Sequence, residues 1–258
     1  GDRLTVRSVK MYADGALGSR GAAMLAPYSD DPSNSGLLVT RPEHMLEVAR
    51  RARAAGYQVN THAIGDRGVR EVLDTYEQAG ATPADRFRVE HFQIVAPSDF
   101  PRLAQHGIIA SMQPTHATSD MPWAEARVGP DRIKGAYAWR TVLNSGARIA
   151  LGSDFPVEDV NPFFGLYSAV TRQDQKGNPS GGWYPDQKLT LPEAIRGFTS
   201  DAAYAAFEGS SRGTIEPGRL ADLTIVEGDL YSAPQSQLFA TKVRYTVVGG
   251  EMVYASVK

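Results

Sequence analysis

Four segments with strand-like character end in a side chain that could bind a metal ion. They are Lys10 in "SVKMYADG", His62 in "VNTHAIGD", His91 in "RVEHFQ" and Asp154 in "ALGSDFPV". His62 and His91 are 29 positions apart. This spacing fits one strand–helix unit, so we expect both at the same level of adjacent strands. Two imidazoles and a carboxylate at the carboxyl ends of parallel strands are suitable ligands for Zn²⁺ or a similar ion. Such an ion could lower the pKa of a bound water molecule and polarise a carbonyl group.

Each of these residues also has a purely structural interpretation. A single histidine at a strand end is more often a hydrogen-bonded structural residue than a metal ligand. Asp154 could cap a loop, because Asp and Ser both favour turns. Lys10 could be a solvated lysine at a strand edge. Their joint occurrence at the ends of successive strands favours the metal site.

The other three histidines differ in their surroundings. His44 lies among charged residues of a helical pattern, so we expect it at the surface. His106 precedes Gly107 at a helix C-terminus, where the helix dipole favours a cation. His116, in "MQPTHATSDMPW", follows a strand into an expected long loop, where it could contact substrate.

Strand-like and helical patterns alternate five times, at the spacing of βα units. Such alternation indicates parallel strands with right-handed crossovers, in a barrel or an open sheet. A closed barrel of this type needs eight strands. The expected strands cover residues 7–15, 57–63, 87–93, 108–114 and 148–156, and the expected helices cover 41–56, 66–80, 96–107, 131–146 and 190–207.

Local signals mark several helix ends. Pro42 falls in the first turn of one helix and Gly56 at its end. Asp66 is a suitable N-cap of the next helix, and Thr190 caps the last one with Pro192 in its first turn.

The pattern changes after residue 211. "GTIEPGRLADLTIVEGDL" and "KVRYTVVGGEMVYAS" are short β patterns with glycine turns and no helix. We therefore expect a partial (β/α) barrel over residues 1–211 and a small β appendage over residues 212–258.

Composition excludes several classes of protein. The 258 residues are 42% hydrophobic and carry a net charge of −2 with no basic stripe, which argues against a nucleic-acid partner. The absence of cysteine excludes disulfides and thiolate metal sites, and it suits a reducing compartment, so we expect a cytoplasmic protein. No apolar run reaches the roughly 20 residues that cross a bilayer, so we expect no membrane association.

Six runs together resemble the amidohydrolase superfamily, most closely its YtcJ-like metal-dependent hydrolases, the amidohydrolase 3 group. These runs are "VKMYADGALGSR", "NTHAIGDRG", "RVEHFQ", "YAWRTVLNSGARIALGSDFPVEDVNPFFGLYSAVTRQD", "LTLPEAIRGFTSDAAYAAF" and "GTIEPGRLADLTIVEGD". The resemblance implies a distorted (β/α)₈ TIM barrel beside a small β-sandwich. It also implies a divalent metal centre, with one or two ions such as zinc, at which water attacks an amide or related C–N bond of a small molecule.

The resemblance also implies roles for individual residues. His62 and His91 match histidine ligands at the ends of strands five and six. Asp154 matches the aspartate after strand eight, which binds metal and accepts the proton of the attacking water. Lys10 matches the lysine of strand four, which bridges two metals when carbamylated; an unmodified lysine would repel the ion. Arg140 and the expected loop over residues 115–132 are further candidates for substrate contact.

One departure from the family pattern is large. The His-x-His of the first family strand, which supplies two ligands, does not occur in these 258 residues. The five expected strands then correspond to family strands four to eight, with only the C-terminal part of the β-sandwich. We therefore expect a chain cut near Gly1 that pairs with a missing N-terminal segment or a second copy, because unpaired strand edges attract other strands.

The leading hypothesis is a metal-dependent hydrolase of a non-peptide amide or cyclic amide bond, with Asp154 as general base. Two alternatives remain open at this point. One is an inactive, truncated half-barrel without the His-x-His ligands, and the other is an ester or phosphotriester hydrolase on the same scaffold.

Overall fold

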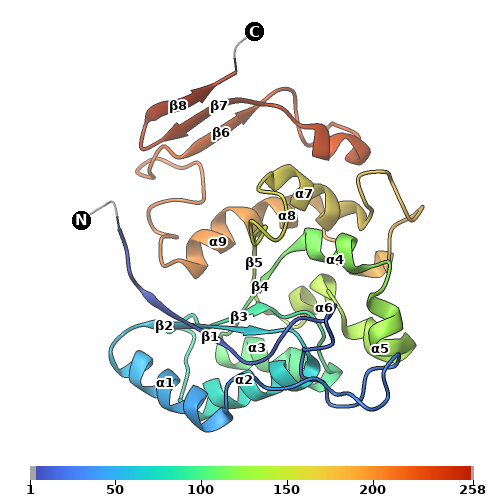
Figure 1. Ribbon diagram of the computed structural model, residues 1–258. Coiled ribbons are helices and arrows are strands. Elements are labelled where there is room, and N and C mark those ends of the chain that lie inside the picture. The colour runs from blue at the N-terminus through green and yellow to red at the C-terminus, as the bar shows by residue number, and fades with distance from the viewer. Residues whose placement is uncertain (1–3, 257–258) are drawn as a thin grey trace. The chain divides into compact units, whose positions relative to one another are not determined.

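The computed structural model, which describes residues 4–256, contains a five-stranded parallel sheet in the order β1-β2-β3-β4-β5 (Figure 1). Gly1, where we expect a cut chain, lies outside the described residues. Sequence order and spatial order coincide, as successive right-handed βα units require. The strands are β1 (Ser8–Tyr12), β2 (Gln58–Ala63), β3 (Arg88–His91), β4 (Ile109–Met112) and β5 (Ile149–Leu151).

Three helices cover one face of β1–β3 (Figure 1): α1 (Pro42–Ala54), α2 (Asp66–Gln78) and α3 (Phe100–His106). Side chains of a strand alternate between its two faces, and the helix-covered face of β2 and β3 carries the buried Val59 and Val89. The buried hydroxyl of Tyr76, on α2, lies 2.7 Å from Thr61 Oγ1 and 2.8 Å from the carbonyl oxygen of Arg88. This polar contact fixes α2 against β2 and β3.

The opposite face of the same strands is polar. It carries Lys10 of β1, Asn60 of β2 and Arg88 of β3, which are neighbours across the three strands. Two residues further along, His62 of β2 lies opposite Glu90 of β3. Arg88 donates a hydrogen bond to Glu90 at 2.7 Å. A parallel sheet with one apolar and one polar face therefore carries two of the predicted ligands, Lys10 and His62, on its polar face.

The helix prediction for residues 131–146 is partly wrong. The structure has α4 (Pro114–Asp120), α5 (Ala124–Arg132) and η2 (Ile133–Gly135), followed by extended residues before α6 (Trp139–Asn144). The chain leaves the helix because its backbone bonds elsewhere: the Val95 N–H donates to Gly135 O at 3.1 Å, and the Tyr137 N–H donates to Gln93 O at 2.8 Å. A Cβ on Gly135 would lie 2.1 Å from Val95 O, so only glycine permits this approach.

The predicted N-cap of α2 is displaced by one residue. Gly65 is the N-cap, and Asp66 is the first residue of the helix. The Asp66 carboxylate instead accepts the backbone N–H of Leu25 at 2.7 Å and that of Arg67 at 3.0 Å. α1 has Pro42 in its first turn, as predicted, and begins at this residue.

Contacts between Cα atoms divide the chain into two units. Among the described residues, the first contains residues 4–112 and 120–149, and the second contains residues 113–119 and 150–256. The second unit includes α7 (Pro162–Thr171), η3 (Pro185–Gln187), α8 (Leu191–Phe198) and α9 (Ser200–Ala205). Thr190 caps α8 in a capping box with Glu193, as expected. The single helix predicted for 190–207 is wrong, since Thr199 is non-helical and separates α8 from α9.

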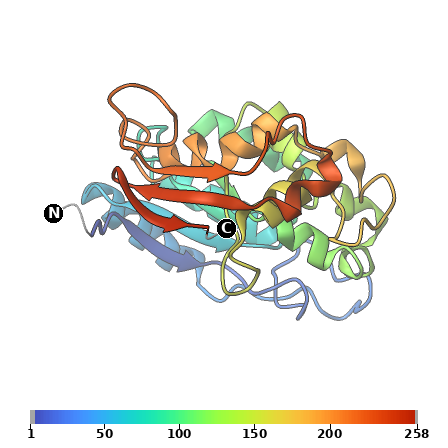
Figure 2. The same ribbon diagram turned by 90° about the horizontal axis from the view of Figure 1, so that it is seen from above.

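The second unit also contains an antiparallel sheet, β6 (Leu223–Val226), β7 (Val243–Val248) and β8 (Glu251–Ala255), with η4 (Gln235–Ala240) between the first two strands (red in Figure 2). The predicted β pattern is confirmed, although η4 adds a short helix. The domain boundary at residues 211–212 stays a prediction.

The fold is therefore an α/β fold with a five-stranded parallel sheet and a separate antiparallel sheet. Among residues 4–256, β1 and β5 are the outer strands of the parallel sheet, and a closed barrel stays a prediction. Within the same residues, no helix combines the length and the apolar character needed to cross a membrane.

Candidate metal-binding site

The carboxyl ends of β2 and β3 bring His62 and His91 together. The parallel register places Ala63, the last residue of β2, opposite His91, the last residue of β3. The two imidazole rings lie 4.6 Å apart between centroids, at an interplanar angle of 70°. Tyr12, at the end of β1, packs against His62 with 5.2 Å between ring centroids. The predicted proximity of the two histidines is confirmed by this geometry, whereas their role as ligands stays a prediction.

His62 is held in the neutral form that binds metals. Burial lowers its pKa to about 4, and the neighbouring His91 and Lys10 act in the same direction. Its Nε2 atom lies 3.3 Å from the carbonyl oxygen of Gly15 and 3.6 Å from Asp14 Oδ1. Because His62 is neutral at pH 7, its contact with Asp14 is not an ion pair there. Neutral imidazole is the form that coordinates metal ions.

Asp14 fixes the backbone around His62. Its buried carboxylate accepts hydrogen bonds from the backbone N–H groups of Ala23 at 2.8 Å, Ile64 at 3.0 Å and Gly65 at 2.8 Å. Burial raises the pKa of Asp14 to about 6, against the three N–H groups, which favour the ionised form. One carboxylate thus joins the end of β1 to the turn between β2 and α2. The sequence interpretation placed Asp14 only at a strand end; the Asp-Gly pair after the strand was the available signal.

His91 and Asp154 share an uncommon backbone conformation. Their φ angles are +73° and +60°, in the left-handed region that residues other than glycine rarely occupy. Such backbone strain persists where the surrounding structure holds it, and it is frequent at functional sites. Two of the predicted ligands are therefore among the nine non-glycine residues of the described chain that adopt a positive φ.

Within the second unit, Asp154 lies beside His116. Asp154 follows β5 in a loop, and its Oδ2 atom lies 3.8 Å from Nε2 of His116. His116 lies in α4, so the loop predicted for residues 115–132 is wrong: α4 and α5 occupy most of it. The pair was not predicted, although both residues were candidates for the site.

Lys10 lies in β1 with its Nζ atom 4.8 Å from the centroid of the Tyr12 ring. A cation over an aromatic face is a favourable contact for the unmodified, protonated side chain. Carbamylation of Lys10 stays a prediction. Arg140 lies half-buried in α6, and its contact with substrate also stays a prediction.

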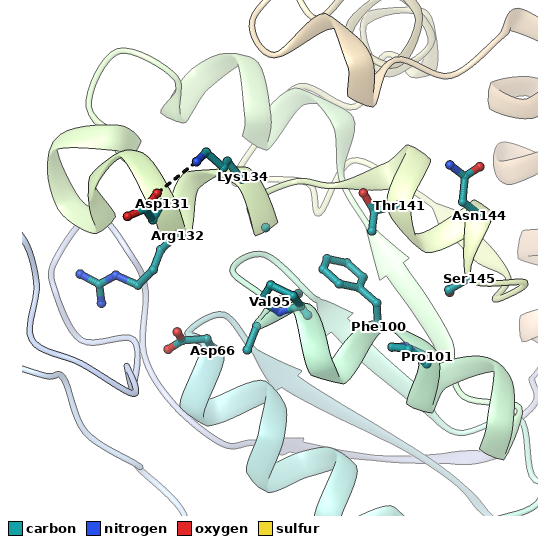
Figure 3. Close-up of a pocket in the computed structure, with 13 residues that line it drawn as sticks. Asp66, Val95, Phe100, Pro101, Asp131, Arg132, Lys134, Thr141, Asn144 and Ser145 are labelled. Carbon is teal, nitrogen blue, oxygen red and sulfur yellow. Dashed lines mark hydrogen bonds and ion pairs between the residues drawn. The ribbon is translucent and has the colours of Figure 1, made fainter.

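A cavity of about 640 Å³ lies in the first unit (Figure 3). Its apolar part is formed by Val95, Phe100 and Pro101, and the ion pair between Lys134 and Asp131 stands at its edge. None of the predicted site residues is among the described residues that line it. We therefore assign it no part in the metal site.

The donor set fits a divalent metal ion. In the first unit, two adjacent imidazoles, one of them held neutral by burial, offer nitrogen atoms of the type that binds metal ions. In the second unit, Asp154 offers a carboxylate. Zinc sites in enzymes commonly use three such protein ligands. The side chains present are therefore of the right type for zinc, although their type alone does not select zinc over similar ions.

Comparison with known proteins agrees with this interpretation. The family model described as "Amidohydrolase family" matches residues 1–254, so the chain belongs to the amidohydrolase family. It is 36% identical over 247 residues to the protein named "Putative amidohydrolase YtcJ" of Bacillus subtilis (strain 168), a match that covers 96% of this chain and 47% of the relative. It is 30% identical over 217 residues to the "N-substituted formamide deformylase" of Arthrobacter pascens, covering 81% of this chain and 38% of the relative.

A solved structure shows the same fold. It is described as an uncharacterized metal-dependent hydrolase from Pyrococcus horikoshii OT3, and it superposes with a TM-score of 0.77 at 34% sequence identity. The match covers 85% of this chain and 44% of that one. The chain thus spans about half the length of the curated relatives it matches, or less.

Proposed function

We propose that the chain carries part of the active site of a metal-dependent amidohydrolase that cleaves a non-peptide C–N bond, in an amide or a cyclic amide. The observation that carries the proposal is the pair of adjacent imidazoles, His62 and His91, at the carboxyl ends of neighbouring parallel strands. Membership of the amidohydrolase family and the likeness to a metal-dependent hydrolase support it. The relative named as a formamide deformylase suggests N-substituted formamides as the first substrates to test.

In this proposal His62, His91 and Asp154 bind a divalent ion such as zinc, and a carbamylated Lys10 would allow a second ion. When bound, the ion supplies a Lewis acid that polarises the carbonyl group and acidifies water. Asp154 accepts the proton of the attacking water on a carboxylate oxygen and returns it to the departing nitrogen. His116, 3.8 Å from Asp154 Oδ2, orients that carboxylate, and His116 and Arg140 contact the substrate.

Asp14 contributes through the position of His62. Its three backbone hydrogen bonds fix the turn that follows β2, and Gly15 O lies 3.3 Å from His62 Nε2. Partners of this kind orient a ligating histidine and determine which ring nitrogen is available to the metal. The Nδ1 atom of His62 is then the free ligand atom.

The absence of a His-x-His sequence from the 258 residues favours a second candidate, a chain that is inactive by itself. In the family pattern those two histidines are ligands, so affinity for metal falls without them. We propose that activity then needs a partner that completes the sheet and the ligand set, supplied by another polypeptide segment or a second copy.

Hydrolysis of N-substituted formamides, measured as formate release by the zinc-loaded chain, tests the proposal. We expect release that stops on addition of a chelator and returns with zinc, and that falls by about 10²-fold or more in Asp154→Asn, as for loss of a general base. The Glu251→Gln variant, on β8, is the control for removal of an exposed carboxylate. Formate release that is unaffected by chelator, or retained in Asp154→Asn, would refute the assignment. Paired amide and ester analogues distinguish an amidohydrolase from an ester or phosphotriester hydrolase.

A further inference from the structure

A second cavity, of about 280 Å³, lies within the second unit. Hydroxyl groups of α4 and carboxylates of two loops line it, among them Thr115, Ser119, Glu158, Asp159 and Asp174. None of these residues has been given a role in the reaction above. The cavity is therefore a candidate site for a part of the substrate that does not react.

The lining carries an excess of negative charge. Glu158, Asp159 and Asp174 supply three carboxylates, and Lys176 is the single basic residue among the described residues of the lining. Across residues 4–256, the structure gives Lys176 no ion-pair partner. The local charge thus favours a cationic ligand.

Each carboxylate uses one oxygen to stabilise the protein. Oε1 of Glu158 accepts a hydrogen bond from the Ser119 hydroxyl, and Oδ1 of Asp159 accepts the Asn161 N–H at 2.8 Å. Oδ1 of Asp174 accepts the N–H groups of Lys176 and Asn178, both at 2.9 Å. Within the described part of the chain, the second oxygen of each carboxylate has no hydrogen-bond partner. The carboxylates are thus held in place with acceptor capacity left over.

A buried hydroxyl independently indicates a missing ligand. Thr115 lines the cavity and is only 9% exposed, and its Oγ1 atom has no hydrogen-bond partner among the described residues. A buried polar atom without a partner costs free energy, so such atoms in native proteins commonly mark a ligand or a water molecule. An ammonium group, with three N–H donors, would satisfy Thr115 Oγ1 together with the carboxylates.

The cavity is connected along the chain to the proposed general base. Thr115 precedes His116 in α4, and Glu158 lies four positions after Asp154 in the same loop. His116 Nε2 in turn lies 3.8 Å from Asp154 Oδ2. Residues of the cavity lining are thus close along the chain to both members of this pair.

We propose that this cavity is a subsite for a primary ammonium group on the substrate, bound by Glu158, Asp159, Asp174 and Thr115. The assignment of the subsite to the substrate rests on the proposed hydrolase function, whereas binding of the cation does not. The class of substrate is then an N-acylated amine that carries a second, free amino group on its chain.

Binding is tested on the metal-free 258-residue chain, so that the amine has no metal to coordinate. The probes are n-butylammonium, the neutral n-butanol and the anionic butyrate, at equal ionic strength, with titrations followed by backbone NMR. We expect saturable changes in the backbone chemical shifts near Thr115 and Glu158 with butylammonium alone. The Glu158→Gln, Asp174→Asn double variant should bind butylammonium about tenfold more weakly, because hydrogen bonds to charged groups are stronger than those between neutral groups. Glu251→Gln, which removes an exposed carboxylate of β8, should bind as the wild type does. Equal shifts with all three probes, or unchanged affinity in the double variant, would overturn the subsite.

A kinetic comparison separates this inference from the proposed function. The zinc-loaded chain is given N-(4-aminobutyl)formamide and the neutral N-pentylformamide. We expect a higher kcat/KM for the amino compound, with the preference reduced about tenfold in the double variant. Equal rates for both compounds would overturn the substrate class and leave the hydrolase intact. Hydrolysis of neither compound, with butylammonium still bound, would refute the hydrolase proposal for this chain and leave the cation site.

Discussion

Gly68 lies so close to Asp14 that a Cβ atom on the glycine would be 2.4 Å from Asp14 Oδ2. Gly68 is buried in the first turn of α2, and Asp14 follows β1. The absence of a side chain at position 68 therefore creates the space for the carboxylate that fixes the turn beside His62. The relationship connects a residue of no chemical reactivity to the geometry of the candidate site.

Gly68→Ala should destabilise the chain, although alanine favours helices by about 1 kcal/mol over glycine. The added methyl group must displace the Asp14 carboxylate from its three N–H partners, and overpacking of this kind costs about 1–3 kcal/mol. Urea unfolding at pH 7 measures the change. Gly152→Ala is the matched control, because a Cβ at Gly152 would meet nothing within 4 Å. Equal midpoints for the two variants would show that the close contact is relaxed at no cost.

Asp14 should also make the folding stability of the metal-free chain depend on pH. Burial raises its pKa from 3.8 to about 6, so the folded state binds the proton more tightly than the unfolded state does. Its contribution to stability is therefore complete below about pH 3.8 and is lost as the pH rises through about 6. His62, whose pKa is lowered to about 4, acts in the opposite direction: its contribution is lost as the pH falls through about 4.

Comparison of the wild type with the Asp14→Asn variant separates the contribution of Asp14 from that of His62, since the variant retains His62. We expect the difference in unfolding free energy between wild type and variant to shrink as the pH rises from about 4 to about 6.5. Asparagine also places an NH₂ group against backbone donors, which costs a further 1–3 kcal/mol or so at every pH. Parallel stability curves for the two proteins would contradict the raised pKa of Asp14.

Lys10 should be carbamylated if a second metal ion binds beside His62 and His91. Its ammonium form rests over Tyr12 and would repel the ion. Native mass spectrometry of the zinc-loaded chain at neutral pH, in bicarbonate, should show the mass of one added CO₂, lost in Lys10→Ala. Lys134→Ala, which removes an exposed lysine of η2, should retain the adduct. Two bound metal ions on a chain of unmodified mass would refute the bridging role.

Local sequence signals identified much of the first unit. Pro42 and the apolar period of α1, together with the strand at Gln58–Ala63, specify a strand–helix order without help from distant residues. The same order placed His62 and His91 on adjacent parallel strands, because the carboxyl ends of such strands meet at one edge. Their type and spacing were enough to predict the contact between their rings.

Other features depend on contacts that spacing does not reveal. The break between α5 and α6 follows from backbone hydrogen bonds of Gly135 and Tyr137 with the segment after β3. Asp14 acquires its role from Ala23 and Gly65, which lie 9 and 51 positions away. Tertiary contacts of this kind override local propensity, and a single sequence carries no direct signal for them.

The central claim is that His62 and His91 bind a metal ion, and zinc binding by the metal-free chain tests it most directly. Isothermal titration should give binding to the wild type and to the His44→Ala, His106→Ala double variant, which removes two histidines of helix surfaces. The His62→Ala, His91→Ala double variant should bind zinc at least about 100-fold more weakly, because it loses both nitrogen ligands of the site. Circular dichroism of this variant checks that it is folded. Zinc bound equally well by all three proteins would contradict the account.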